Sequence, residues 1–549
     1  MKRRWAQFWR NVGFVGFCLL GAGVLGVSVF GGGGREVVGS AEVVGSVEES
    51  LRDVLGEFDA VVEAGWRERG VVPVGAADSM LVVRRISLAL TGTVPSLEEL
   101  RELEAVAEEE RVDWWLAKLF ADRRTSDYLA ERLARMLVGV EGGPFLVYRR
   151  RRMVNWLSDE LWEGRRYDEL VRNLIAAEGI WTSQPEVNFL TVTIDQNEEG
   201  GGPDEVKLAA RVSRAFLGVR IDCVECHDDM FGERWKQSDF HQLAAYFGDA
   251  KMALSGVRDD DELVYETRYR GEIEAVEVAP RVPFSPGLMA AEGTLRERLA
   301  GWVTHVENGA FARATVNRFW ALMFNKPLVE PIDDIPLEGP WPGAMEFLAE
   351  DFVEHGFDVR RLVGLIAGSR VFGLESRAAD GEVVPGEEQE ESWAVFPMTR
   401  LRPEQVAGSV LQASSLRTID AGSHVLKRVL RMIQQGDFIK RYGDGGEDEF
   451  EGRGGTIPQR LLMMNGELLR GRTEDNVVMN ASTRIGALAP DDGTAVDSAY
   501  EAVLTRLPGD EERAHFVGLL AERGDKGRAE VMADLFWVLM NSTEFSWNH

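Results

Sequence analysis

The sequence predicts a mainly α-helical protein with two helical domains, a small β-hairpin or sheet between them, and an N-terminal membrane helix. Three observations predict this fold class. Apolar residues recur at helical spacing through most of the chain, one central segment alternates in polarity, and an uncharged run follows a basic N-terminus. With 549 residues, 45% of them hydrophobic, the chain is long enough to bury a large core.

The N-terminal segment, residues 1–34, is expected to direct export. After a basic stretch, residues 11–30 carry no charge and almost no polarity, and four glycines follow them. About 19 apolar residues just span a bilayer core of roughly 30 Å, and the preceding positive charges place the N-terminus inside. A cleaved signal peptide has the same order of features, usually with a shorter apolar region. The length favours an uncleaved anchor. We therefore expect a single-pass inner-membrane protein whose body lies in the periplasm or an equivalent exported compartment.

Helices dominate the predicted first domain, residues 47–250. Helical spacing predicts helices over residues 47–66, 97–108, 112–121, 125–138, 151–163, 167–177 and 204–217. Ser96 and Glu99 have the spacing of a capping box, which marks the start of the second of these helices. Residues 149–152 are four consecutive arginines, which we interpret as a solvated helix face paired with nearby acids rather than as an anion site.

A β-hairpin connector is expected over residues 260–285, because residues 262–283 alternate in polarity around Gly271. The C-terminal helical domain, residues 294–549, follows it. Within this domain, helical spacing predicts helices over residues 294–307, 310–324, 344–355 and 359–367.

The charge balance excludes several classes of protein. The chain has 62 Lys and Arg against 91 Asp and Glu, a net charge of −29. Four positive charges and no acid lie in the first ten residues, so the rest carries −33. Nucleic-acid binders gain affinity from clustered Lys and Arg, so we expect no nucleic-acid partner. Three cysteines in the whole chain also exclude a scaffold built from disulfides.

One segment contains residues with distinctive chemistry. Cys223, Cys226 and His227 form a C-x-x-C-H pattern, which is typical of covalent attachment of c-type haem. Two thiols one helical turn apart reach the two vinyl groups of one porphyrin, and the adjacent imidazole then lies below the iron as proximal ligand. Both cysteines outside the apolar N-terminal run lie in this motif, and export supplies the compartment in which bacterial haem c is attached.

Two other interpretations of this segment stay open. In an oxidising compartment, Cys223 and Cys226 are also able to form a disulfide. A zinc-like metal site would draw its ligands from these cysteines and from His227, His241 and Asp228. No distal haem ligand is evident, which leaves His241, a methionine or a remote histidine for that position. The chain lacks the common nucleophile, zinc-protease, P-loop and dinucleotide signatures, so catalytic residues are unknown and an enzymatic activity is neither predicted nor excluded.

Five ordered motifs resemble segments of one known family. The segments RRISLALTGTVPSLEEL and LGVRIDCVECHDDMFGERWKQSDFHQLAAYF are similar to the start and end of its first domain. ARATVNRFWALMFNKPLVEPIDDI, LRPEQVAGSVLQASSL and the closing residues, with Met463–Asn465, are similar to the second. The family is the pair of domains of unknown function abundant in planctomycetes, a cytochrome-like domain followed by its C-terminal companion. The motifs cover most of residues 80–549.

The resemblance implies an exported protein without an established activity. It carries over Cys223, Cys226, His227 and Asp228 directly. The family commonly has a second histidine and a proline after this aspartate, where the present chain has aspartate and methionine, and this weakens a metal site that uses that histidine. The family also accompanies sulfatase-like proteins, which suggests a sulfatase-like partner and extracellular polysaccharide turnover by association.

Three hypotheses follow. The first is a membrane-anchored, exported protein that attaches one haem c through Cys223 and Cys226, with His227 on the iron, for electron transfer to a basic redox partner. The second is a non-catalytic surface or scaffold protein in which the two cysteines form a disulfide. The third is a metal-binding protein of polysaccharide or sulfatase systems that uses the same cysteines with His241.

Overall fold

The computed structural model describes residues 40–140, 143–144, 146–195, 202–229, 234–260, 262–377, 385–419, 464, 466–473 and 480–549. The chain divides into two compact units, Met1–Ser50 and Leu51–His549, and the following description concerns the second. The membrane helix expected at residues 11–30 lies outside the described residues. Within the described ranges, none of the helices combines the length and the apolar composition that a membrane crossing needs.

The N-terminal half is helical, as the spacing of apolar residues predicts. Its helices are α2 (Ser40–Arg69), α3 (Ser79–Thr91), α4 (Leu97–Leu103), α5 (Arg111–Phe120), α6 (Arg123–Val138), α7 (Arg150–Trp162), α8 (Tyr167–Ile175), α9 (Asn188–Thr191), α10 (Glu205–Val212) and α11 (Gln237–Ala244). The capping box of α4 is confirmed, since Ser96 Oγ accepts from Glu99 N–H and Glu99 Oε2 accepts from Ser96 N–H. The helix predicted over 204–217 changes at Ser213 into the π-helical turn η3 (Ser213–Leu217).

The strands are short and pair antiparallel. β1 (Ile194–Asp195) pairs with β2 (Gly202–Pro203), β3 (Ala250–Ala253) with β4 (Gly256–Asp259), β5 (Glu266–Thr267) with β6 (Val276–Glu277), and β7 (Thr399–Arg400) with β8 (Trp547–Asn548). The expected hairpin between residues 262 and 283 is therefore present, although only two residues of each strand pair. The longer hairpin β3–β4 was not predicted from the alternation of polarity. Val257 in β4 also exchanges backbone hydrogen bonds with Gly179, a contact between residues distant in sequence.

The C-terminal half is also helical. Its helices are α12 (Leu295–Val303), α13 (Gly309–Phe324), α14 (Gly343–Glu354), α15 (Val359–Gly368), α16 (Glu387–Glu391), α17 (Pro403–Ala413), α20 (Glu467–Thr473), α21 (Ala481–Leu488), α22 (Asp492–Leu504), α23 (Asp510–Met540) and α24 (Thr543–Ser546). The four helices predicted between residues 294 and 367 are confirmed as α12–α15.

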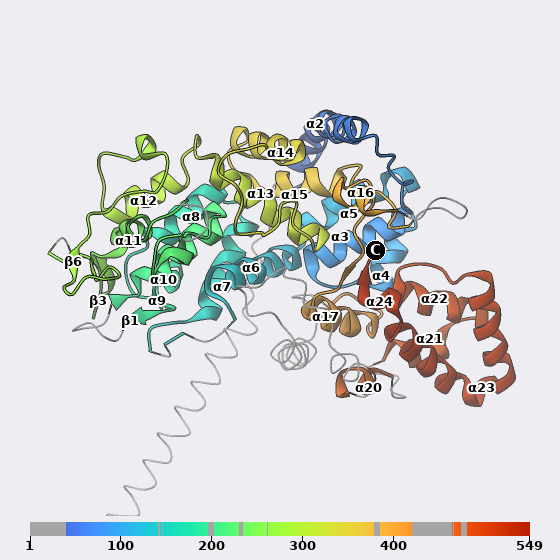
Figure 1. The fold of residues 1–549 in the computed structure, drawn as a ribbon. Helices are drawn as coiled ribbons and strands as arrows, with labels where there is room; N and C mark the ends of the chain where they lie inside the picture. The colour runs from blue at the N-terminus through green and yellow to red at the C-terminus, as the bar shows by residue number, and fades with distance from the viewer. Residues whose placement is uncertain are drawn as a thin grey trace, which may run out of the picture. The chain divides into compact units, whose positions relative to one another are not determined.

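Two hydrophobic cores stabilise this unit. The larger joins buried residues from Phe58 to Phe396, so helices on both sides of the β5–β6 hairpin pack into one core. The smaller consists mainly of residues 401–545, and Leu88 and Val94 from the N-terminal half complete it. Figure 1 shows α8, α10, α11 and α12 grouped at one end of this unit and α21, α22 and α23 at the other. The domain limits 47–250 and 294–549 stay a prediction.

A buried arginine in α3 joins the end of the chain to this core. Arg85 is fully buried, and its Nε donates to the His549 carbonyl at 2.7 Å. Its Nη1 donates to the carbonyls of Phe372 and Leu374 at 2.9 and 2.7 Å, and its guanidinium lies 3.6 Å from the centre of the Phe396 ring. The neighbouring Arg84 donates to two further carbonyls, those of Val503 and Phe545. The paired arginines of this segment are therefore structural.

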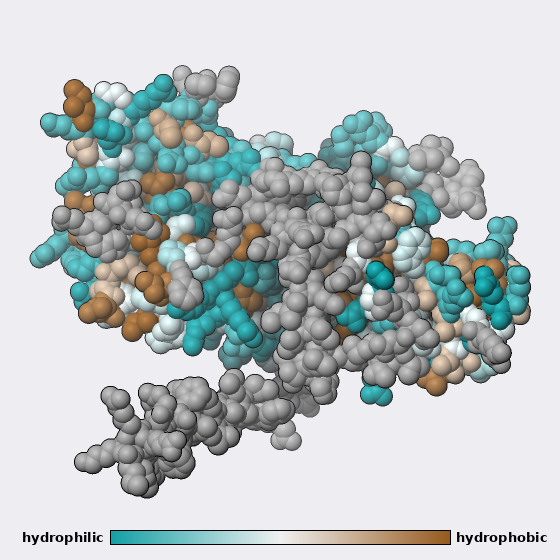
Figure 2. All heavy atoms as spheres, turned by 90° about the horizontal axis from the view of Figure 1, so that it is seen from below, coloured by the Kyte–Doolittle hydropathy of each residue, from teal (hydrophilic) through white to brown (hydrophobic). Residues whose placement is uncertain are grey.

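The surface is predominantly polar on the face drawn in Figure 2. There the described hydrophobic residues form small groups separated by hydrophilic ones. This distribution agrees with the position of the large apolar side chains, most of which belong to the two cores.

Candidate functional site

The C-x-x-C-H segment begins at a backbone turn that only glycine adopts easily. Gly218 ends η3 with φ +62°, in the left-handed region. A Cβ at this position would lie 3.0 Å from Ile335 Cδ1 and 3.2 Å from Ala314 Cβ. The Gly218 carbonyl also accepts a hydrogen bond from Ile335 N–H at 2.7 Å. The turn therefore fixes where the short 3₁₀-helix η4 (Ile221–Val224) starts.

A set of ion pairs holds η4 against the helices before it. Arg214 donates to both carboxylate oxygens of Asp222, at 2.7–2.9 Å, and to Asp333 at 3.2 Å. Arg220 donates to the other oxygen of Asp333 at 2.7 Å. Burial alone would lower the pKa of Arg214, but Asp222, Asp333 and Cys223 raise it above its ordinary value. Cys223 thus lies within the electrostatic reach of a permanent positive charge.

The two cysteines of the motif are free and exposed. Neither Cys223 nor Cys226 forms the disulfide of the second hypothesis in this structure. Val224, which lies between them in the sequence, is buried at 2% exposure. The turn therefore anchors itself through Val224 and leaves both sulfur atoms accessible.

His227 is held in one tautomer by the next residue. Its Nδ1 lies 2.8 Å from the carbonyl oxygen of Asp228. Because a carbonyl only accepts, Nδ1 carries the proton and Nε2 keeps its lone pair. Nε2 has no hydrogen-bond partner in the described part of the chain. This is the tautomer in which an imidazole coordinates a metal through Nε2.

His241 does not share this freedom. It is 5% exposed on α11, where Nδ1 lies 2.8 Å from the Tyr265 hydroxyl and Nε2 lies 3.0 Å from the Glu225 carbonyl. Gln237 Nε2 donates to the same carbonyl at 2.9 Å. Burial lowers the pKa of His241, although the Glu225 carbonyl raises it, so the ring is neutral at pH 7. Both ring nitrogens are engaged, and His241 clamps the turn between the two cysteines.

Asp228, the remaining candidate ligand, has a local structural contact. Its Oδ1 accepts a hydrogen bond from the backbone N–H of Gln237, the first residue of α11, at 2.8 Å. This carboxylate satisfies one of the open N–H groups at the start of that helix. Among the described residues, no three His, Cys, Asp or Glu side chains are grouped closely enough to hold a metal ion. The zinc-like site therefore stays a prediction without a ligand set.

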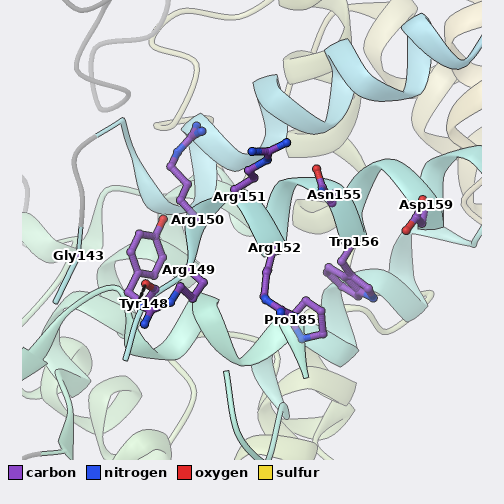
Figure 3. A pocket seen from close by; sticks show the side chains of 10 residues that line it. All are labelled: Gly143, Tyr148, Arg149, Arg150, Arg151, Arg152, Asn155, Trp156, Asp159 and Pro185. Carbon is purple, nitrogen blue, oxygen red and sulfur yellow. Dashed lines mark hydrogen bonds between the residues drawn. The ribbon is translucent and has the colours of Figure 1, made fainter. Parts of the chain in front are cut away.

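A second candidate site lies where the sequence predicted an ordinary solvated face. A pocket of about 810 Å³ opens at the start of α7, and its lining residues are Gly143, Tyr148, Arg149, Arg150, Arg151, Arg152, Asn155, Trp156, Asp159 and Pro185. Figure 3 shows the arginines, Asn155 and Trp156 along the first turns of α7. The expected acid pairing holds for Arg150, which forms a bidentate ion pair with Glu131 at 2.9 and 3.0 Å. The signal for a pocket was the arginine run followed by Asn and Trp one turn later.

Comparison with known proteins gives two matches, both to family models. Residues 57–252 match PSCyt2, described as a protein of unknown function (DUF1549), and residues 295–440 match PSD1, described as a protein of unknown function (DUF1553). Neither a curated protein nor a solved structure matches the chain. The resemblance inferred from the motifs is confirmed, and the chain belongs to the proteins that carry these paired domains of unknown function in N- to C-terminal order.

Proposed function

We propose that this chain is an exported electron-transfer protein that attaches one haem c to Cys223 and Cys226, with His227 as the proximal iron ligand. The observation that carries the proposal is the His227 tautomer, with Nδ1 bonded to the Asp228 carbonyl and Nε2 available to iron. The two free, exposed thiols three residues apart supply the sulfur atoms for covalent attachment to the porphyrin.

The chemistry of attachment uses only groups present in the chain and the porphyrin. Each cysteine S–H adds across one vinyl C=C bond, so the sulfur forms a thioether, the proton goes to the vinyl carbon, and no oxidant is needed. When bound, haem supplies reversible one-electron exchange. The chain holds the turn in place through the Arg214–Asp222 ion pair and through the clamp of His241 on the Glu225 carbonyl.

The N-terminal segment and the net charge of the chain suggest where the protein acts and what it binds. The basic stretch and the apolar run of residues 11–30 support export and anchoring in the inner membrane. The −33 charge outside the first ten residues favours a basic redox partner, because complementary charges accelerate encounter. The structure engages both nitrogens of His241, so we assign it to positioning the motif and not to the distal side of the iron.

The test is co-expression of the full chain with a bacterial haem c maturation system, followed by the pyridine haemochrome spectrum of the denatured protein. We expect a covalent haem signal that the Cys223→Ala/Cys226→Ala variant loses. His227→Gln keeps both thiols but replaces the imidazole by an amide, which is a poor iron ligand, so the absorption spectrum and the reduction potential should change. His305→Gln, which alters a histidine outside the motif, is the matched control and should leave both unchanged.

A colourless, exported and folded protein would refute the haem assignment. In that case, the mass of the intact chain separates the alternatives. A loss of two hydrogens identifies the disulfide of a scaffold protein, and retained metal under native conditions identifies a coordination site.

A further inference from the structure

The C-x-x-C-H turn and the residues that hold it belong to different family domains. The motif and Gly218 lie in the first domain, which matches residues 57–252, whereas Asp333 and Ile335 lie in the second, which matches residues 295–440. Asp333 and Ile335 are buried, at 4% and 3% exposure, in the segment that follows α13. The two domains therefore meet at the turn that carries the cysteines.

Helix α13 of the second domain fixes the start of this segment. The Asn317 side chain is fully buried in α13. Its Oδ1 accepts from Val329 N–H at 2.9 Å, and its Nδ2 donates to the Val329 carbonyl at 2.8 Å. A side chain on a packed helix thus satisfies both backbone groups of Val329, so the residues that follow start from a fixed point.

Ile335 contacts the turn before the motif through its backbone and its side chain. Its N–H donates to the Gly218 carbonyl at 2.7 Å. A Cβ at residue 218 would lie 3.0 Å from Ile335 Cδ1, closer than ordinary van der Waals contact. The first domain therefore supplies the glycine that lets the second domain approach this closely.

Asp333 binds two arginines of the first domain at once. Its Oδ1 accepts from Arg220 Nε at 2.7 Å, and its Oδ2 accepts from Arg214 Nη1 at 3.2 Å. Arg214 at the same time binds Asp222, the residue before Cys223. Charge-assisted hydrogen bonds of a buried carboxylate fix geometry strongly, and its removal would leave both arginines without a shared counter-charge.

A second ion pair joins the two domains after the motif. Arg234 Nη1 donates to Asp334 Oδ1 at 3.3 Å, and each side chain is about one-third exposed. Because exposed ion pairs contribute little to stability, we assign the holding role to Asp333 and Ile335. The segment after α13 thus contacts the first domain on both sides of the C-x-x-C-H motif.

We propose that the second domain completes the haem-attachment site of the first, with Asp333 and Ile335 as positioning residues for Cys223 and His227. Asp333 acts through two arginines of the first domain, and Ile335 acts through Gly218. The proposal rests on the proposed function for the group that is attached, whereas the positioning is a property of the chain without haem. It gives the second domain of unknown function a role, and the paired domains then form one site.

Hydrogen exchange of the full chain without haem, followed by mass spectrometry, tests the positioning. Asp333→Asn keeps the size of the side chain and removes its charge, so peptides that cover residues 218–229 should exchange about tenfold faster or more. Asp351→Asn is the matched control, because Asp351 is also buried in the second domain and forms a bidentate ion pair with Arg361. The control should leave exchange of residues 218–229 unchanged.

Ile335→Ala gives the same comparison with every ion pair in place, and it serves alone if Asp333→Asn does not fold. It should also accelerate exchange of residues 218–229, by a smaller factor, because the contact with Gly218 is lost. Exchange of these residues at the parent rate in a folded Asp333→Asn variant, or in Ile335→Ala if that variant alone folds, would overturn the proposal.

The loaded protein gives a readout that a purely structural role would not move. A buried negative charge near the iron favours its oxidised state, so Asp333→Asn should raise the reduction potential and Asp351→Asn should not. Arg220→Gln/Asp333→Asn removes one charge of each sign and should return the potential toward that of the parent. A parent chain that attaches no haem would refute the proposed function, and the exchange experiment would still decide the positioning.

Discussion

Replacement of His241 by phenylalanine tests the role that the structure gives to this histidine. Phenylalanine retains the aromatic packing among Phe240, Tyr265 and Tyr269 and removes both ring nitrogens. Two buried hydrogen bonds are lost, those to the Tyr265 hydroxyl and the Glu225 carbonyl. At about 1 kcal/mol each, we expect the free energy of unfolding to fall by about 2 kcal/mol.

The expected loss depends on pH in a defined direction. Burial lowers the pKa of His241 below the ordinary value of 6.5, so the unfolded chain binds a proton at this site before the folded chain does. The histidine's stabilisation is therefore complete above pH 6.5 and declines as the pH falls below it. The phenylalanine variant has no such dependence, and its difference from the parent chain should be larger at about pH 8 than at about pH 5.

Urea unfolding followed by tryptophan fluorescence and circular dichroism at both pH values measures this difference. Tyr265→Phe removes only one partner and should cost about 1 kcal/mol. The double variant should show a coupling of about 0.5–1.5 kcal/mol between the two positions. Equal stability of parent and His241→Phe at about pH 8, or a difference that grows toward pH 5, would refute the clamp.

Three other changes have defined outcomes. Arg85→Met should lower the free energy of unfolding by about 3–5 kcal/mol, because three buried carbonyls, including that of His549, lose a charged donor. The fall in melting temperature measures this loss, and an unchanged melting temperature would contradict the prediction. Burial raises the pKa of Glu501 to about 7, although Arg101 lowers it. The folded chain therefore binds a proton at Glu501 more readily than the unfolded chain, and the stability that this proton provides declines as the pH rises from about 4.5 through 7. Glu501→Gln should remove that decline from the free energy of unfolding in urea, and a decline that persists in the variant would contradict the role of Glu501. Gly218→Ala should cost about 1–2 kcal/mol, from its positive φ and the contact with Ile335, and a variant as stable as the parent would exclude strain at this turn.

Much of the fold was predictable because its determinants are local. The capping box at Ser96 and Glu99 and the spacing of apolar residues give the start and the length of most helices to within a few residues. No helical period is visible in the residues of α3, because ten of them are buried and the helix has no polar face. The hairpin β3–β4 was missed for a different reason, since its pairing to Gly179 depends on contacts distant in sequence.

In the candidate site, too, the features set by local sequence were predictable and those set by contacts distant in sequence were not. The spacing of Cys223, Cys226 and His227 indicates haem attachment without any structure. The role of His241 was not predictable, because its two partners, a tyrosine hydroxyl and a backbone carbonyl, are brought to it only by folding. The arginine run was interpreted as a helix face paired with nearby acids, and this holds for Arg150, which pairs with Glu131. Which carboxylates lie near a helix face depends on tertiary packing, so the partner of each arginine was not predictable from the sequence.

The measurement that tests the central claim most directly is mass spectrometry of the tryptic peptide 221–234 from the full chain, purified after co-expression with the haem c maturation system. This peptide contains both cysteines and His227. The account predicts that it carries one haem, bound covalently through both sulfur atoms. A peptide with two unmodified thiols, or one that is two hydrogens lighter because of a disulfide, would contradict it.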